Sequence, residues 1–158
     1  MPRIAYVTGS NGFLGVNIVQ QLVNDGWEVH ALRRKTSNTR DLDRLPVKQV
    51  EGDVLDKASL ERTMPENVDA VFHVAADTAM WSQLAERQNR INIEGTRNVV
   101  AVALAKKAKR LIHTSSIGSF GPIFDQVVSE DTPSRAMQGD INYYRSKYLA
   151  EQEVFKGI

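Results

Sequence analysis

The sequence contains no cysteine, has almost no net charge and lacks any long apolar run. The absence of cysteine excludes disulfide bonds and metal sites built on thiolates. A formal net charge of +1 gives no reason to expect nucleic acid or a membrane surface as a partner. No apolar stretch approaches the roughly 20 residues that a membrane-spanning helix needs. The first strand-like segment leaves no room for a signal peptide, so we expect a cytoplasmic protein.

What the sequence does contain is a regular alternation of strand-like and helix-like patterns over 158 residues, enough for one domain with a sizeable core. Apolar runs predict strands at 4–8, 28–32, 48–51, 68–75 and 110–115. Helical spacing predicts helices at 13–25, 57–64, 83–107 and 140–155, the last with Asp140 as its N-cap. Strands that alternate with helices predict an α/β fold with a doubly wound parallel sheet. Right-handed crossovers favour the strand order 3-2-1-4-5.

A glycine-rich turn joins the first strand to the first helix, and it is typical of dinucleotide-binding sheets. Gly9 permits a tight turn, Gly12 permits a pyrophosphate to approach the backbone, and Gly15 permits close packing of helix and strand. The amides and the dipole at the helix start favour a phosphate. The alternative is a glycine-rich turn without a ligand. We expect the cofactor to contact Gly9, Asn11, Gly12, Phe13, Leu14 and Gly15.

Basic residues follow the second strand, where NAD-binding sheets usually carry an acidic residue. An arginine at position 33 would pair with a 2′-phosphate, which favours NADP(H) over NAD(H). Arg34 belongs to the same cluster, and Arg40 is a second candidate phosphate ligand. The alternative is a solvated basic connector.

Two further strand ends carry candidate cofactor contacts. Asp53 could accept the adenine amino group while Val54 packs on the ring, or Asp53 could cap the helix that starts near Lys57. The small side chains of Ala75 and Ala76 would let the backbone lie against the cofactor, or they reflect tight packing alone.

Tyr143 and Lys147 lie four residues apart, so they share one face of the last predicted helix. An ammonium close to a phenol favours the phenolate, which suits a tyrosine that exchanges a proton with a carbonyl or alcohol oxygen. An amphipathic helix with aromatic side chains is the alternative. The hydroxyls of Thr114, Ser115 and Ser116, at the end of the fifth predicted strand, could bond the same oxygen or cap a turn.

We predict no metal site. The three histidines, His30, His73 and His113, lie within predicted strands and have no second ligand at metal-like spacing. We expect them to be satisfied core or edge histidines.

Six segments occur together in one order: T-G-S-N-G-F-L-G, G-D-V, V-F-H-V-A-A, N-I-E-G-T, T-S-S-I-G-S-F-G and Y-Y-R-S-K-Y-L-A-E. The chain therefore resembles the extended short-chain dehydrogenase/reductase superfamily, with the NAD-dependent epimerase/dehydratase fold. It is most similar to the dihydroflavonol 4-reductase branch, in H-V-A-A-D-T-A-M-W, in N-I-E-G-T-R-N-V-V and in Arg33.

This resemblance implies a Rossmann fold and hydride transfer between a nicotinamide and a small carbonyl or alcohol. It implies that Tyr143 is the general acid/base and that Lys147 stabilises the phenolate and holds the nicotinamide ribose. It implies that Ser116, rather than Ser115, is the catalytic serine. Asn92 matches an asparagine of the family's central helix, where a structural role is the alternative.

Members of the resembled family are about twice as long, so residues 1–158 are expected to form an NADP-binding domain at the N-terminus of a longer enzyme. The C-terminal strands and the substrate domain would be missing, which predicts impaired turnover; a naturally short relative is the alternative. Two other functions remain open, a nucleotide-sugar epimerase or dehydratase and a non-catalytic NADP-binding module. Exposed apolar surface would favour a homo-oligomer.

Overall fold

A parallel sheet is the centre of the computed structural model, which describes residues 2–124 and 126–157; Met1, Asp125 and Ile158, within the predicted domain span, lie outside these ranges. The strands are β1 (Ile4–Thr8), β2 (Glu28–Arg33), β3 (Lys48–Glu51), β4 (Ala70–His73) and β5 (Leu111–His113). All their pairings are parallel, and the spatial order is β3-β2-β1-β4-β5. The predicted fold class and strand order are confirmed.

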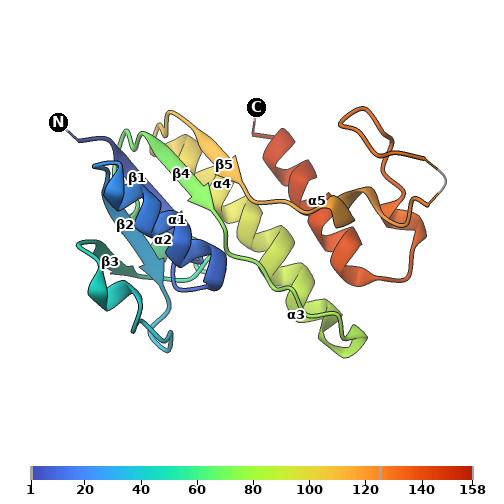
Figure 1. Ribbon diagram of the computed structural model, residues 1–158, viewed down its shortest axis with the longest axis horizontal. Coiled ribbons are helices and arrows are strands. Elements are labelled where there is room, and N and C mark those ends of the chain that lie inside the picture. The colour runs from blue at the N-terminus through green and yellow to red at the C-terminus, as the bar shows by residue number, and fades with distance from the viewer. Residues whose placement is uncertain (1, 125, 158) are drawn as a thin grey trace.

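The helices are α1 (Phe13–Asn24), α2 (Lys57–Thr63), α3 (Ala85–Asn89), α4 (Gly95–Ala105) and α5 (Asn142–Phe155). Figure 1 shows α1 and α4 on opposite sides of the sheet, with α5 beyond α4. No helix in the described ranges combines the length and apolar character that a bilayer crossing requires.

The sheet has an apolar core on each face because successive strand residues point to opposite sides. Ala5 and Val7 pack with Val19 and Leu22 of α1 on one face. The intervening residue, Tyr6, packs on the other face with apolar residues of α2 and α4, among them Leu60, Val99 and Val102. Tyr6 is fully buried, and its hydroxyl bonds the Thr63 hydroxyl at 2.8 Å. These two cores fix the strands whose ends form the site.

The helix predicted at 83–107 is present but is not a regular α-helix throughout. A 3₁₀ turn at Ser82–Leu84 leads into α3, and a π-helical segment at Arg90–Glu94 separates α3 from α4. Asn92 lies in this segment and is buried, with its side-chain amide bonded outside the helix. A π turn re-aims side chains without ending the helix, which fits that use.

Two predicted boundaries are also wrong. The strand predicted at 68–75 pairs only over β4, because Val74 and Ala75 donate their amides to the Thr8 hydroxyl rather than to a strand. Asp140 does not cap the last helix, which begins at Asn142 with Ile141 at the cap position and no side-chain cap.

An ion-pair group attaches α5 to α4. Glu153 of α5 has a side chain only 8% exposed, and it accepts from Arg97 Nε at 2.9 Å and Lys156 Nζ at 2.6 Å. The hydrogen bonds from Arg97 and Lys156, and secondarily their charges, hold the pKa of Glu153 down, at about 2. This contact holds the helix that carries Tyr143 and Lys147.

Candidate active site

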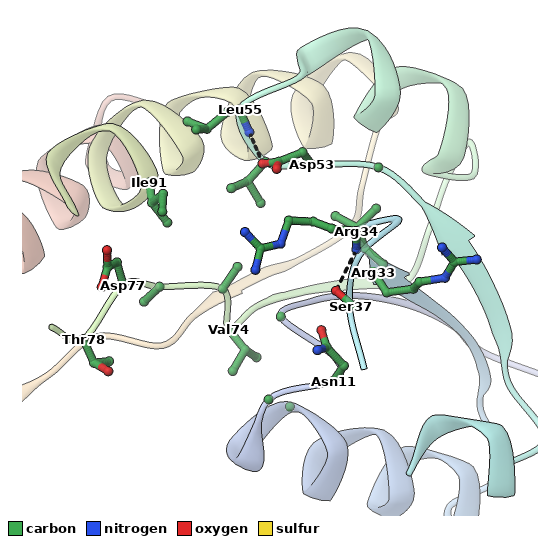
Figure 2. A pocket seen from close by; sticks show the side chains of 18 of the residues that line it. Asn11, Arg33, Arg34, Ser37, Asp53, Leu55, Val74, Asp77, Thr78 and Ile91 are labelled. Atoms are coloured by element: carbon green, nitrogen blue, oxygen red, sulfur yellow. Dashed lines mark hydrogen bonds between the residues drawn. The ribbon is translucent and has the colours of Figure 1, made fainter. Parts of the chain in front are cut away.

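The carboxyl ends of β1, β2, β3 and β4 surround a pocket of about 520 Å³ (Figure 2). Its position is where ligands bind in doubly wound sheets. Eleven of the predicted cofactor contacts line it: Gly9, Asn11, Gly12, Leu14, Gly15, Arg33, Arg34, Asp53, Val54, Ala75 and Ala76. Phe13 and Arg40 do not line it, and Phe13 is 90% exposed. Ser116, Tyr143 and Lys147 also lie outside this lining.

The glycine turn at the pocket tolerates no side chain at two positions. Gly9 has φ +65°, and a Cβ there would lie 2.6 Å from the Ala75 amide nitrogen. A Cβ on Gly15 would lie 2.0 Å from the Gly9 carbonyl oxygen. The turn is closed by the Gly12 amide, which donates to the Gly9 carbonyl at 3.0 Å, and Gly12 is the N-cap of α1. The start of α1 therefore faces the pocket as backbone, which suits a phosphate.

A buried hydrogen-bond chain connects β1, β4 and α4 beneath this turn. The Thr8 hydroxyl accepts the Val74 and Ala75 amides, both at 3.2 Å, so its proton goes to His73 Nδ1 at 2.7 Å. His73 Nε2 then donates to the Thr96 hydroxyl at 2.9 Å. Burial, and secondarily the His113 and Lys147 charges, lower the pKa of His73 to about 3.

This chain confirms His73 as a satisfied core histidine, but the sequence analysis missed its partners. The available signal was the strand register, because Thr8 and His73 are direct partners at the ends of neighbouring strands.

The two arginines after β2 point in different directions. Arg33 donates to Glu51 Oε2 at 2.9 Å, its register partner on β3. Figure 2 shows the Arg34 side chain extending into the pocket, whereas the Arg33 side chain points away from it. Arg40 is exposed, and its backbone amide bonds the Asn38 side chain.

Asp53 does not cap α2, which overturns that alternative. The N-cap is Asp56, whose carboxylate accepts the Ser59 amide at 3.2 Å. Asp53 instead accepts the Leu55 amide at 2.9 Å within its own turn, and both residues line the pocket. Val54 is buried and packs against Gly95 at the start of α4.

The pocket wall that follows Ala76 is held by Asn92. The Asn92 side chain accepts the Asp77 amide at 2.7 Å and donates to the Asp77 carbonyl at 3.0 Å. Its amide nitrogen also donates to the Ser146 hydroxyl of α5 at 2.9 Å, and that hydroxyl donates to the Tyr143 carbonyl. Asn92 therefore joins the pocket wall to the helix that carries Tyr143. This is the structural role that the sequence analysis left open.

Arg87 is a pocket residue that the sequence analysis did not identify. It donates to Asp77 Oδ2 at 2.8 Å and lines the same pocket, although its side chain is largely exposed. Its signal was weak, because it is one basic residue in a segment predicted as a regular helix.

Lys147 is buried between α5 and the end of β5. Its exposed fraction is 3%, and its ammonium donates to the Thr114 carbonyl at 2.7 Å. Burial lowers the pKa of Lys147, and the Glu151 charge opposes this shift.

Tyr143 lies one turn before Lys147 on α5, is half-buried, and its hydroxyl has no hydrogen-bond partner among the described residues. The neighbouring Tyr144 ring packs on Gly118, where a Cβ would lie 2.6 Å from the ring. Tyr143 thus differs from Tyr144 in that its ring does not pack on Gly118, and it is the tyrosine four residues before Lys147.

The two serines at the end of β5 have different partners. Ser115 donates its hydroxyl to Glu151 of α5. Ser116 accepts the Gly118 amide at 3.1 Å and caps a short 3₁₀ turn, so its own proton is left to donate.

His113 departs from the expectation of satisfied histidines. Both of its ring nitrogens are buried with no hydrogen-bond partner in the described residues. Burial and the Lys147 charge lower its pKa to about 4. His30 is bonded through Nε2 to Glu28 at 3.1 Å, while its Nδ1 has no partner in that part of the chain.

Comparison with known proteins supports the sequence resemblance. The sequence model of the NAD dependent epimerase/dehydratase family matches residues 5–156. A putative dihydroflavonol 4-reductase from Synechocystis sp. is 36% identical over 149 residues, which is 94% of this chain and 43% of that protein. The chain thus spans under half the length of this relative.

Two solved structures share the fold. The crystal structure of gox2253 has a TM-score of 0.87 and 34% identity, covering 97% of this chain and 46% of that one. A dTDP-glucose 4,6-dehydratase from Streptomyces venezuelae, solved with NAD bound, has a TM-score of 0.83 and 25% identity, covering 95% and 50%.

Proposed function

The chain belongs to the NAD dependent epimerase/dehydratase family, and from that membership we propose that it is the NADP(H)-binding part of an oxidoreductase. Its substrate would be a small ketone, aldehyde or alcohol, as for a dihydroflavonol reductase. The observation that carries this proposal is the Asn92 connection, which joins a nucleotide-sized pocket to the helix of Tyr143 and Lys147.

The pocket residues fit a dinucleotide. Gly9 and Gly15 allow the turn to pack tightly against Ala75 and against itself, and the N-terminus of α1 offers backbone amides to a pyrophosphate. The residues proposed to hold the cofactor here are Asn11 and Gly12 in the turn, with the flanking Phe13 and Leu14.

The adenosine end would lie between the ends of β2 and β3. Asp53 and Val54 would contact the adenine, and Arg34 extends where a 2′-phosphate would bind. Arg33 would contribute after exchanging its Glu51 partner, and Arg40 would act from the adjoining loop. These cations support a preference for NADP(H).

Tyr143 is proposed to donate a proton to the substrate carbonyl oxygen and to accept it in the reverse reaction. The buried Lys147 ammonium would stabilise the phenolate that remains. Ser116 would donate its free hydroxyl proton to the same oxygen. The bound nicotinamide would supply or accept the hydride.

Separate fluorescence titrations with NADPH and NADH test the cofactor assignment. We expect tighter NADPH binding, and at least about a tenfold weakening of NADPH binding alone in Arg34→Ala, since one charge-assisted phosphate contact is worth roughly 1.5–3 kcal/mol. Arg44→Ala, a change of the same kind outside the pocket lining, is the control. Tighter NADH binding by the unmodified chain would overturn the NADP(H) assignment.

Oxidation of NADPH with a panel of small ketones and aldehydes tests catalysis. Tyr143→Phe should abolish turnover and spare NADPH binding, while Tyr148→Phe should leave both intact. Turnover that survives in Tyr143→Phe would contradict the proposed role of Tyr143.

A nucleotide-sugar epimerase or dehydratase that uses NAD is the second candidate. The Arg33–Glu51 ion pair favours it, because Glu51 places a carboxylate beside the end of β2. Tighter NADH binding would select this candidate.

A further inference from the structure

Two consecutive residues at the end of β5 are each bonded to a different side chain of α5. The Thr114 carbonyl accepts from Lys147, and the Ser115 hydroxyl donates to Glu151. Lys147 and Glu151 are four residues apart, so they lie one turn apart on one helix face. Glu151 has no part in the mechanism above.

We propose that Glu151 is a positioning residue of the site: its carboxylate fixes the strand end that carries Ser116 against the helix that carries Tyr143, and places a negative charge one helical turn from Lys147. The catalytic meaning of this inference rests on the proposed function. The contacts of Glu151 do not depend on it.

The positional part follows from the turn around Ser116. Ser116 follows Ser115 directly in the chain. Its hydroxyl accepts the Gly118 amide at 3.1 Å, and its carbonyl accepts the Ser119 amide at 2.9 Å. The turn contacts α5 again where Gly118 packs on the Tyr144 ring. The Ser115–Glu151 bond is therefore a polar attachment of the turn to α5, beside the bond from Lys147 to the Thr114 carbonyl and the packing of Gly118 on the Tyr144 ring.

The electrostatic part follows from the surroundings of Lys147. Its ammonium is buried and bonds a neutral carbonyl, and it faces the sheet histidines His113 and His73, whose pKa values it lowers. Burial disfavours a charged lysine, and the Glu151 carboxylate is the opposite charge that offsets this effect. A neutral Lys147 would lose its attraction for the phenolate of Tyr143.

Three variants separate the two parts. Glu151→Gln keeps an oxygen that can accept from Ser115 but removes the charge. Glu151→Ala removes both, and Ser115→Ala removes only the hydrogen bond. Glu153→Gln is the matched control, because it makes the same change two residues along α5 at an ion pair directed to Arg97. Circular dichroism checks that each variant is folded.

The pKa of Lys147 is measured by NMR with ¹³C-labelled lysine, its resonance being identified by its loss in Lys147→Met. We expect Glu151→Gln and Glu151→Ala to lower this pKa, and Ser115→Ala and Glu153→Gln to leave it unchanged. An unchanged Lys147 pKa in folded Glu151→Gln would overturn the proposal.

Hydrogen exchange at the Gly118 and Ser119 amides measures the position of the turn. We expect exchange to be at least about tenfold faster in Glu151→Ala and Ser115→Ala, which corresponds to about 1.4 kcal/mol, and near the unmodified rate in Glu151→Gln. Unchanged exchange in Glu151→Ala would overturn the proposal. Neither measurement needs cofactor or substrate, so a failure of NADPH to bind would contradict the proposed function without affecting this test.

Discussion

The two halves of the site differ in how their neighbouring histidines, His73 and His113, are paired. In the nucleotide half, His73 is bonded through both ring nitrogens, and the side chain and backbone of Asp77 are bonded to Asn92, Arg87 and Ala79. In the half formed by β5 and α5, neither ring nitrogen of His113 has a partner in the described residues, and the Tyr143 hydroxyl is uncommitted.

Exposed apolar side chains occur in both halves, since Phe13, Met80 and Trp81 are 90%, 67% and 62% exposed. Ile112 of β5, Ile117 and Phe124 are 37%, 73% and 94% exposed, all in or after β5. The pocket is lined by residues between positions 9 and 91, whereas Ser116 follows β5 and both Tyr143 and Lys147 lie on α5. We therefore predict that changes in the two halves have separable effects, and the following changes test this.

The largest effect is expected at the glycine turn. Gly15→Ala would place a Cβ 2.0 Å from the Gly9 carbonyl oxygen, and overpacking of this kind costs about 1–3 kcal/mol. We expect a loss of stability near 3 kcal/mol in urea unfolding, and at least a tenfold loss of NADPH affinity, about 1.4 kcal/mol. Gly139→Ala, where the nearest atom would lie at 3.4 Å, is the control and should be near neutral. Equal losses of unfolding free energy in Gly15→Ala and Gly139→Ala would contradict the tight packing of the turn.

His73 and His113, whose ring centroids lie 5.3 Å apart in a tilted arrangement, give the most direct contrast between the halves. His73→Leu leaves the Thr8 and Thr96 hydroxyls without their partner in the core, which should cost about 1–3 kcal/mol. His113→Leu removes a ring whose nitrogens are unpaired, so we expect a cost under about 1 kcal/mol, or a gain. Urea unfolding of both variants at pH 7.5 measures the difference. A larger loss of unfolding free energy in His113→Leu than in His73→Leu would contradict this difference between the two histidines.

The same histidines predict how stability depends on pH. Their pKa values are about 3 and 4 in the folded chain, below the ordinary 6.5. The unfolded chain therefore binds more protons as the pH falls from 6.5, and stability falls with it.

Each histidine contributes up to about 1.4 kcal/mol per pH unit in this window. The pKa of the ion-paired Glu153 is held at about 2, against an ordinary 4.5. Protonation of Glu153 therefore lowers the stability only below about pH 4.5. Urea unfolding between pH 6.5 and 4.5 should show a smaller slope in His113→Leu; a stability independent of pH there would be inconsistent with buried neutral histidines.

The smallest effect is expected at the helix starts. Asp56 caps α2, so Asp56→Ala should cost about 1 kcal/mol. Asp140 precedes α5 without capping it, so Asp140→Ala should stay within about 0.5 kcal/mol. Thermal unfolding of the two variants compares them, and a greater loss at Asp140 would contradict the observed start of α5.

The sequence predicted the strand order and most pocket residues because their causes are local. Alternating strands and helices determine the sheet, and the glycine spacing determines the turn at Gly9. The π turn around Asn92 could not be predicted, because it depends on bonds to Asp77 and Ser146, 15 and 54 residues away.

The hydrogen-bond partners of individual side chains could not be predicted from the sequence either. Whether Arg33 faced a phosphate or Glu51 depended on the register of β2 and β3. The Ser115–Glu151 bond joins residues 36 apart on two elements, and residue type does not indicate such a pair. The family resemblance supplied the roles of Tyr143 and Ser116, and those roles stay predictions.

Proximity between the cofactor and Tyr143 is the central claim. NMR of the chain with ¹³C-labelled tyrosine, saturated with NADP⁺, measures it directly through nuclear Overhauser effects. We predict an effect between the nicotinamide ring protons and the Tyr143 ring, with its resonance identified by its loss in Tyr143→Phe. Saturable NADP⁺ binding without any such effect would contradict the claim.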